Sequence, residues 1–162
     1  TDAFAELDPK HRVKWIGPDM SVRSSITARL METWAHGLAI YDALGVVRQD
    51  ADRIKNIVVL GINTFNWSFQ VKGQTPPGQL PFIELAAPSG EIWQFGEPND
   101  VSAVSGTASD FCQVVTQTRN ISDTNLKLIG PVAEAWMSHA QCFAGPPETP
   151  PEENTRFTKA LA

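Results

Sequence analysis

The stretch ARLMETWAHGLAIYDALG occupies residues 28–45 and decides how the first part of the chain folds. In and just before it, apolar side chains recur in steps of four and three, which is the spacing of one face of an α-helix. We predict a helix over residues 21–44, capped by Asp19 or Ser21 and ended by Gly45. Its apolar stripe consists of Ile26, Leu30, Trp34, Leu38, Tyr41 and Leu44.

A second stripe of this helix carries Glu32 and His36, one turn apart. Side chains at positions i and i+4 lie on one face, roughly 6 Å apart at Cβ, so a carboxylate and an imidazole can meet at one cation. Zn²⁺ accepts both ligand types. A solvated ion pair has the same spacing, but small residues flank the stripe and leave room for another helix or a ligand: Ala28, Ala35 and Ala39. We therefore predict that Glu32 and His36 are metal ligands.

This metal site is expected to be incomplete within the chain. A catalytic zinc normally has three protein ligands and one open position. His11 falls in a connector and is predicted to be exposed, whereas His139 lies on an apolar helix face, where a satisfied core histidine is the preferred interpretation. The third ligand is expected outside the chain. Nickel or iron would also accept nitrogen and oxygen donors.

Beyond Gly45 the hydrophobic pattern predicts a mixed α/β region, so the fold class is α+β. The expected elements are a helix over 50–71, a hairpin over 80–96, a strand over 101–104, a helix over 106–118, a strand over 126–129 and a helix over 131–143. The expected organisation is a connector at 1–20, a ligand-bearing helix at 21–46, an α/β domain at 50–145 and a Pro/Glu-rich tail at 146–162 that is extended or disordered.

Several other side chains are candidates for a role in the site. Arg29, one turn before Glu32, could hold a substrate carboxylate or orient Glu32. Arg119 follows an apolar helix; a cation favoured by the helix C-terminus is the simpler interpretation, and a carboxylate clamp is the functional one. Asp42 is expected at the surface, and Cys112 and Cys142 are expected to be small buried apolar groups.

The composition excludes several functions. A net charge of -5 without a basic run argues against nucleic acid as a partner. No apolar stretch approaches the roughly 20 residues of a membrane helix. Two cysteines without CxxC spacing do not make a disulfide framework, so a cytoplasmic protein with reduced thiols is expected.

The segment from Ala28 to Gly37, continuing to Asp42-Ala43-Leu44-Gly45, resembles the DinB-like, mycothiol-dependent maleylpyruvate isomerase superfamily, and within it a branch of metal-binding proteins of undefined reaction. The resemblance covers about residues 4–147. Further matching words are Trp15-Ile16-Gly17-Pro18, Ala87-Pro88-Ser89-Gly90-Glu91-Ile92-Trp93, Asp110-Phe111-Cys112, Val115-Thr116-Gln117 and the segment from Ala140 to Pro147.

The resemblance implies a four-helix bundle that binds a divalent metal, followed by a small α/β domain similar to sterol carrier proteins. In that family the ligands are a His on the second bundle helix and an E-x-x-x-H on the last, which Glu32 and His36 match here. An arginine of the C-terminal domain helps to bind substrate or thiol, and Arg119 matches it loosely by position. The first three bundle helices and the first His ligand are missing, so Thr1 is expected near the end of the third helix, with a companion polypeptide supplying the rest.

Three functions follow from these expectations. The first is a metal-dependent transferase or isomerase in which zinc lowers the pKa of a small thiol, and the thiolate adds to a small electrophile. The second is a non-catalytic module whose α/β part holds an apolar ligand. The third is a structural subunit whose helix at 21–44 completes a partner's bundle, which predicts an exposed apolar stripe.

Overall fold

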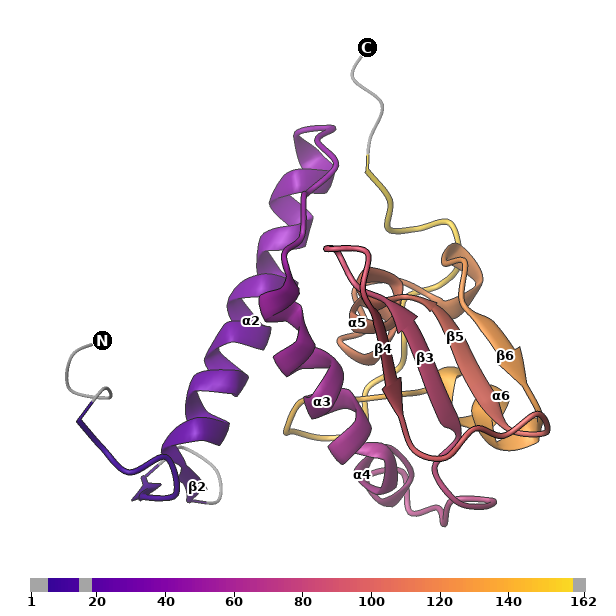
Figure 1. Cartoon of the computed structure of the whole chain (residues 1–162). Coiled ribbons are helices and arrows are strands. Elements are labelled where there is room, and N and C mark those ends of the chain that lie inside the picture. The colour runs from indigo at the N-terminus through magenta and orange to yellow at the C-terminus, as the bar shows by residue number, and fades with distance from the viewer. Residues whose placement is uncertain (1–5, 15–18, 159–162) are drawn as a thin grey trace.

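The structure is a computed structural model that describes residues 6–14 and 19–158. Figure 1 shows a long helix standing beside a helix-backed sheet. The expectation that Thr1 continues a bundle helix, and the matching word over residues 15–18, lie outside the described residues. No helix in the described part has both the length and the apolar character needed to cross a membrane.

The long helix, α2, runs over Val22–Ala43. Ser21 caps it, because its side chain accepts a hydrogen bond from the Ser24 amide, and Gly45 follows its end with a φ of 66°. Both boundary predictions are confirmed to within a residue or two. The predicted stripe is only partly right: the face that packs on the rest of the protein contains Met31, Trp34 and Leu38, while Ile26, Tyr41 and Leu44 of the predicted stripe are exposed.

The segment before α2 was expected to be an irregular connector, and that expectation is wrong for part of it. Strands β1 (Arg12–Val13) and β2 (Met20–Ser21) pair in an antiparallel manner. The amide of Val22 then donates to the carbonyl of His11. The short ribbon therefore closes over the first turn of α2 and buries Val22.

The helix expected over residues 50–71 is broken into three parts. A 3-10 turn, η1 (Asp52–Ile54), leads into α3 (Lys55–Asn63), and α4 (Phe65–Gln70) follows Thr64. The Thr64 hydroxyl donates to the carbonyls of Leu60 and Gly61, at 2.9 Å each. Such back-bonding competes with the helical pattern and bends the helix axis.

The sheet has the strand order β4-β3-β5-β6, with β3 and β5 parallel and the outer pairs antiparallel. Its strands are β3 (Phe82–Ala86), β4 (Ile92–Phe95), β5 (Ala103–Thr107) and β6 (Lys127–Ile129). The predicted hairpin and last strand are confirmed. The predicted helix over 106–118 starts too early, because β5 continues to Thr107; that side chain then caps α5 (Ala108–Val115) by accepting from the Asp110 amide.

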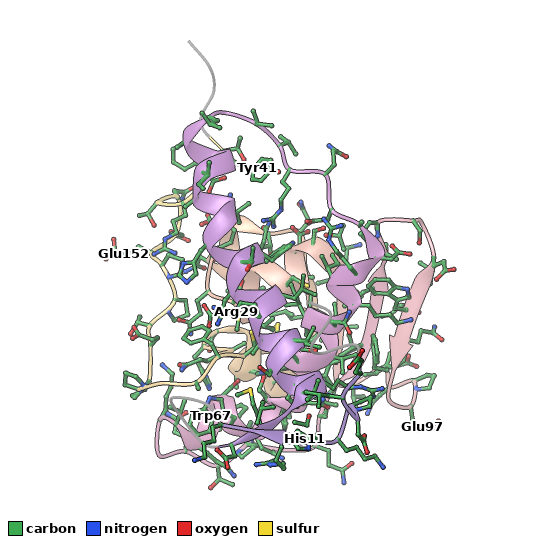
Figure 2. The ribbon with its side chains drawn as sticks, turned by 90° about the vertical axis from the view of Figure 1, so that its left-hand side faces the viewer. His11, Arg29, Tyr41, Trp67, Glu97 and Glu152 are labelled. Atoms are coloured by element: carbon green, nitrogen blue, oxygen red, sulfur yellow. The ribbon has the colours of Figure 1, made fainter. Side chains whose placement is uncertain are left out.

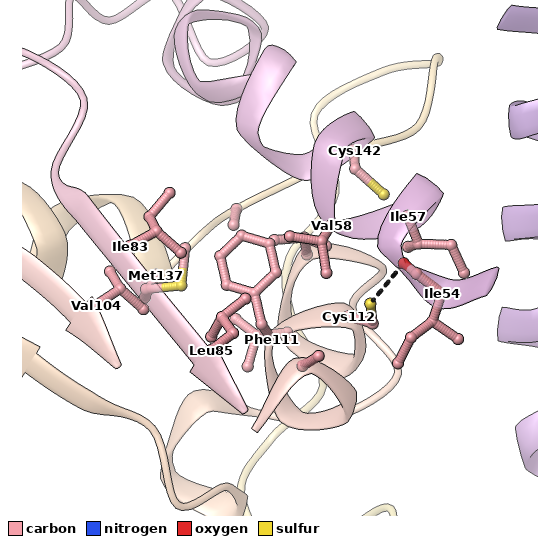
Figure 3. Close-up of a cluster of buried hydrophobic side chains, with 14 of the residues drawn as sticks. Ile54, Ile57, Val58, Ile83, Leu85, Val104, Phe111, Cys112, Met137 and Cys142 are labelled. Carbon is pink, nitrogen blue, oxygen red and sulfur yellow. Dashed lines mark hydrogen bonds between the residues drawn. The ribbon is translucent and has the colours of Figure 1, made fainter. Parts of the chain in front are cut away.

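The remaining helices are short. A 3-10 turn, η2 (Ile121–Asp123), precedes β6, and α6 (Pro131–Met137) begins on a proline as predicted but ends before Phe143. The core lies between the sheet and the helices α3, α5 and α6 (Figure 3). Phe111 and Trp136 are fully buried at its centre and meet edge to face, with ring centroids 5.8 Å apart. The α+β class is confirmed, whereas the sterol-carrier-like character of this part stays a prediction.

The tail was expected to be extended or disordered, and within the described residues it is irregular, with a turn at 153–154, and bonded to the domain. The side-chain amide of Asn120 donates to the Pro151 carbonyl at 2.8 Å, and the backbone amide of Asn154 donates to the Asp123 carboxylate at 2.9 Å. The Thr158 hydroxyl reaches Asp42 on α2 at 3.2 Å. The tail has no periodic run of apolar side chains and is attached by these polar contacts, which is why hydropathy alone did not predict its order.

One carboxylate joins α2 to the rest of the protein. Asp50 accepts hydrogen bonds from Trp34 Nε1 on α2 at 2.8 Å, from Arg48 Nε at 3.1 Å and from the hydroxyl of Ser109 on α5 at 2.7 Å. The Arg48 guanidinium lies 4.0 Å from the Trp34 ring centre and donates to the Trp34 carbonyl. Asp50 and Arg48 are almost fully buried, and both bond to Trp34 of α2. Moving α2 would break these bonds within a buried ion pair, so the pair fixes where α2 lies.

We expect Asp50→Ala to lower the free energy of unfolding by about 3 kcal/mol, since it leaves three partly buried donors without their acceptor. Urea unfolding followed by circular dichroism measures this change. The matched control is Asp100→Ala, which removes an exposed carboxylate and should change the free energy of unfolding by less than about 0.5 kcal/mol. Equal losses for the two variants would contradict the proposed importance of Asp50.

Candidate functional site

A cavity of about 710 Å³ opens between α2, the turn after α5 and the C-terminal segment. Helix α2 contributes Glu32, His36 and Asp42, while the turn contributes Arg119. Figure 2 looks onto α2, with the C-terminal segment, marked by Glu152, along one flank of the helix. The structure therefore brings the predicted metal ligands and Arg119 to one hollow. The full lining is Met31, Glu32, Ala35, His36, Leu38, Ala39, Asp42, Ala43, Thr116, Thr118, Arg119, Phe143, Thr155, Arg156 and Phe157.

Glu32 and His36 meet at the rim of the cavity. Glu32 Oε2 and His36 Nε2 are 3.1 Å apart, and the side chains are 43% and 84% exposed, respectively. Two ligands of a tetrahedral zinc, each about 2.0–2.1 Å from it, stand about 3.3 Å apart, so the pair has the spacing that two such ligands need. The same geometry also makes an ordinary hydrogen bond between the two side chains.

The described residues hold no cluster of three or more His, Cys, Asp or Glu side chains that could surround a metal. The pair therefore fits as part of a ligand set. Both the metal assignment and the expectation that a further ligand comes from elsewhere stay predictions.

Arg119 differs from both sequence-based interpretations. Its side chain is 8% exposed, with Nη2 2.6 Å from Asp42 Oδ1 and Nη1 donating to the Thr118 carbonyl at 2.9 Å. Asp42, expected at the surface, is 13% exposed, so that expectation is wrong. The partners lie 77 positions apart, and sequence spacing gave no signal that joined them.

Local backbone geometry turns Arg119 inward. Gln117 has a φ of 54°, in the left-handed region that non-glycine residues seldom adopt. Its side-chain amide donates to the Ala140 carbonyl at 3.0 Å, and the Thr116 hydroxyl donates to the Cys112 carbonyl at 2.7 Å. These buried bonds hold a tight reversal after α5, and the chain therefore passes beneath α2.

The other candidates lie outside the cavity. Arg29 is exposed on α2 and does not line the hollow, so its proposed role in catalysis stays a prediction. Cys112 and Cys142 are buried, as expected, and burial raises the pKa of both thiols above the usual range. The Cys112 thiol faces the Ile54 carbonyl at 3.7 Å (Figure 3). Neither thiol is suited to act as a nucleophile at neutral pH.

The two remaining histidines are separate from Glu32 and His36. His11 is exposed, as predicted. His139 packs edge to face on Phe69, with ring centroids 4.7 Å apart, and its Nδ1 lies 3.2 Å from the Ser138 hydroxyl. Its Nε2 is buried and has no hydrogen-bond partner among the described residues. His139 follows the end of α6 and is only half-buried, so the prediction of a satisfied core histidine on a helix face is wrong. Burial, and then the nearby Lys72, lower its pKa.

These features define an α+β protein whose long helix presents a carboxylate–imidazole pair beside a cavity with a buried arginine. Residues 1–41 match the mycothiol maleylpyruvate isomerase N-terminal domain. This match supports the expected membership of the chain in the mycothiol maleylpyruvate isomerase-like DinB superfamily.

Two curated relatives are similar over most of the chain. They are uncharacterized proteins of Mycobacterium tuberculosis, from strains CDC 1551 / Oshkosh and H37Rv, each 46% identical over 136 residues, which is 84% of this chain and 53% of theirs. The chain thus spans about half the length of the curated relatives it matches. No solved structure gives a significant match.

We expect the histidine at position 139 to make stability depend on pH. Because its pKa is lowered in the folded state, the unfolded chain binds the proton more readily, and stability falls as pH drops below the unfolded pKa of about 6.5. Urea midpoints at pH 7.5 and 5.5 should differ less in His139→Gln than in the parent protein. His11→Gln, at an exposed site, is the control; the same pH dependence in all three proteins would contradict this assignment.

Proposed function

We propose that this chain is part of a divalent-metal-dependent enzyme, a thiol-dependent transferase or isomerase that acts on a small electrophilic molecule. The observation that carries the proposal is the Glu32–His36 pair, 3.1 Å apart at the rim of a cavity whose wall contains Arg119. The match of residues 1–41 to the mycothiol maleylpyruvate isomerase N-terminal domain supports the thiol-dependent class.

In this proposal Glu32 Oε2 and His36 Nε2 hold zinc or another divalent metal. When bound, such a metal supplies positive charge that lowers the pKa of a thiol beside it. The exposure of His36 leaves its side of the site open to the solvent or to a partner. The buried Asp42–Arg119 pair joins α2 to the turn after α5, which would keep Glu32 and His36 in place beside the cavity.

The missing ligand would come from a companion segment that packs on α2. Six positions, spaced by four and three, form a seam on a face of the helix that excludes the buried Met31 and Leu38: Ile26, Leu30, Thr33, Gly37, Ile40 and Leu44. Ile40 is 63% exposed, and added atoms at Gly37 would meet nothing within 4 Å. This is the spacing by which one helix packs along another. His36 lies beside the seam, so a helix docked there could supply a third ligand to the same metal.

We expect Glu32→Ala and His36→Ala each to weaken zinc binding by at least tenfold, because each removes one of two ligands. Competition with a chromophoric chelator measures this, with His11→Ala as a matched histidine control outside the site. Native mass spectrometry with elemental analysis then counts metals and companion chains in the purified protein. Unchanged zinc affinity in both variants would rule out this metal site and leave a non-catalytic binding module as the better account.

We expect Ile40→Lys to weaken association with a polypeptide made from the half of the relatives' sequence that this chain does not match. The variant places a charge in the seam, where docking would bury it. Analytical ultracentrifugation should show at least a tenfold loss of affinity. Val47→Lys is the control, because Val47 is also exposed but follows the end of α2. Equal affinities for both variants would place the companion elsewhere.

A further inference from the structure

The C-terminal segment 154–158, here called the strap, contributes to the cavity wall. Thr155, Arg156 and Phe157 line the cavity together with Glu32 and His36. A second hollow of about 550 Å³ lies against the same segment and shares Arg156, Phe157 and the underlying Arg119. The strap therefore lies between the two hollows, and Arg119 and Arg156 line both of them.

The two arginines differ in what they can still bind. Arg119 is buried and already donates to Asp42 and to the Thr118 carbonyl. A ligand carboxylate could take its guanidinium only by breaking a buried ion pair, and an unpaired Asp42 carboxylate would remain. Arg119 is therefore better suited to holding α2 against the turn after α5 than to binding a ligand.

Arg156 has hydrogen-bond donors that a ligand could use. The side chain is exposed, and Nη1 donates to the Gln117 carbonyl at 3.3 Å. Among the described residues, none of the carboxylates lies within ion-pair distance of it, whereas Arg48 and Arg119 each have one. Within the described part of the chain its guanidinium thus has no carboxylate partner, and most of its donors are available to an anion.

We propose that Arg156 binds the anionic group, a carboxylate or phosphate, of a small molecule that occupies this cavity. A guanidinium offers two parallel N–H donors to either group, which fixes the orientation of the ligand as well as its position. This assigns ligand recognition to the tail, where the sequence pattern indicated no function, and gives Arg119 the role of positioning α2. The inference deepens the proposed function, because the ligand would lie in the cavity that Glu32 and His36 border.

The position of Arg156 depends on three polar attachments of the strap. The Asn154 amide donates to the Asp123 carboxylate at 2.9 and 3.1 Å, Arg156 itself donates to Gln117, and the Thr158 hydroxyl donates to Asp42 at 3.2 Å. The last contact joins the strap to the carboxylate that also pairs with Arg119. The Asp42–Arg119 ion pair, which closes one end of the cavity, therefore also holds the strap in place.

The test is a calorimetric or NMR titration of the full chain, with chelator present, using malonate and inorganic phosphate as probes. We expect Arg156→Gln to bind the preferred probe at least tenfold more weakly and Arg156→Lys to retain part of the affinity, since Lys keeps the charge and loses the fork. Arg53→Gln removes an exposed arginine outside the cavity and should bind like the parent protein. The ratio of malonate to phosphate affinity distinguishes a carboxylate from a phosphate ligand.

Unchanged affinity for both probes in Arg156→Gln would overturn the proposal, as would an equal loss in Arg53→Gln. Arg156 is exposed, so its variants should keep the thermal midpoint of the parent protein; a fall in the midpoint of Arg156→Gln that Arg156→Lys fully restores, with no restored binding, would also overturn it. The titration needs no metal. A negative result therefore leaves the zinc test of Glu32 and His36 intact, and failure of the zinc test leaves the anion site standing.

Discussion

The carboxylate of Asp50 accepts hydrogen bonds from three separate parts of the chain, and the placement of the long helix depends on them. Trp34 on α2, Arg48 in the following loop and Ser109 on α5 all donate to it. The Arg48 guanidinium over the Trp34 ring adds a cation–π contact at the same junction. A helix that packs through one narrow face needs such directional bonds, because apolar contact alone leaves its rotation and its register poorly fixed.

The cavity is a consequence of this junction. With α2 fixed against α5, Asp42 reaches the arginine that the turn at Gln117 directs inward, and a buried ion pair forms between elements far apart in sequence. Glu32 and His36, on the flank of the same helix, then border the hollow that this pair closes at one end. The strap adds a second cation and attaches itself to Asp42. A small set of polar contacts therefore positions every charged group of the candidate site.

Within the described part of the chain, only one face of α2 packs against the rest of the protein. Its inner face is packed through Met31, Trp34 and Leu38, while Ile26, Ile40 and Leu44 on the opposite side remain exposed. In the proposed function this second face receives a companion segment, and the metal ligands lie near the boundary between the two faces. In that proposal, the arrangement accounts for the exposure of Glu32 and His36.

The sequence by itself determined what depends on near neighbours. The helix over residues 22–43, its Ser21 cap, the Gly45 stop, the hairpin around residues 80–96 and the one-turn spacing of Glu32 and His36 all follow from local propensity and period. Tertiary structure decided which apolar face of α2 is buried, because several of its faces are apolar and only packing selects among them. It also decided the partner of Arg119, the acceptor role of Asp50 and the place of Arg156, since each depends on side chains brought together from distant positions, which local periodicity does not encode.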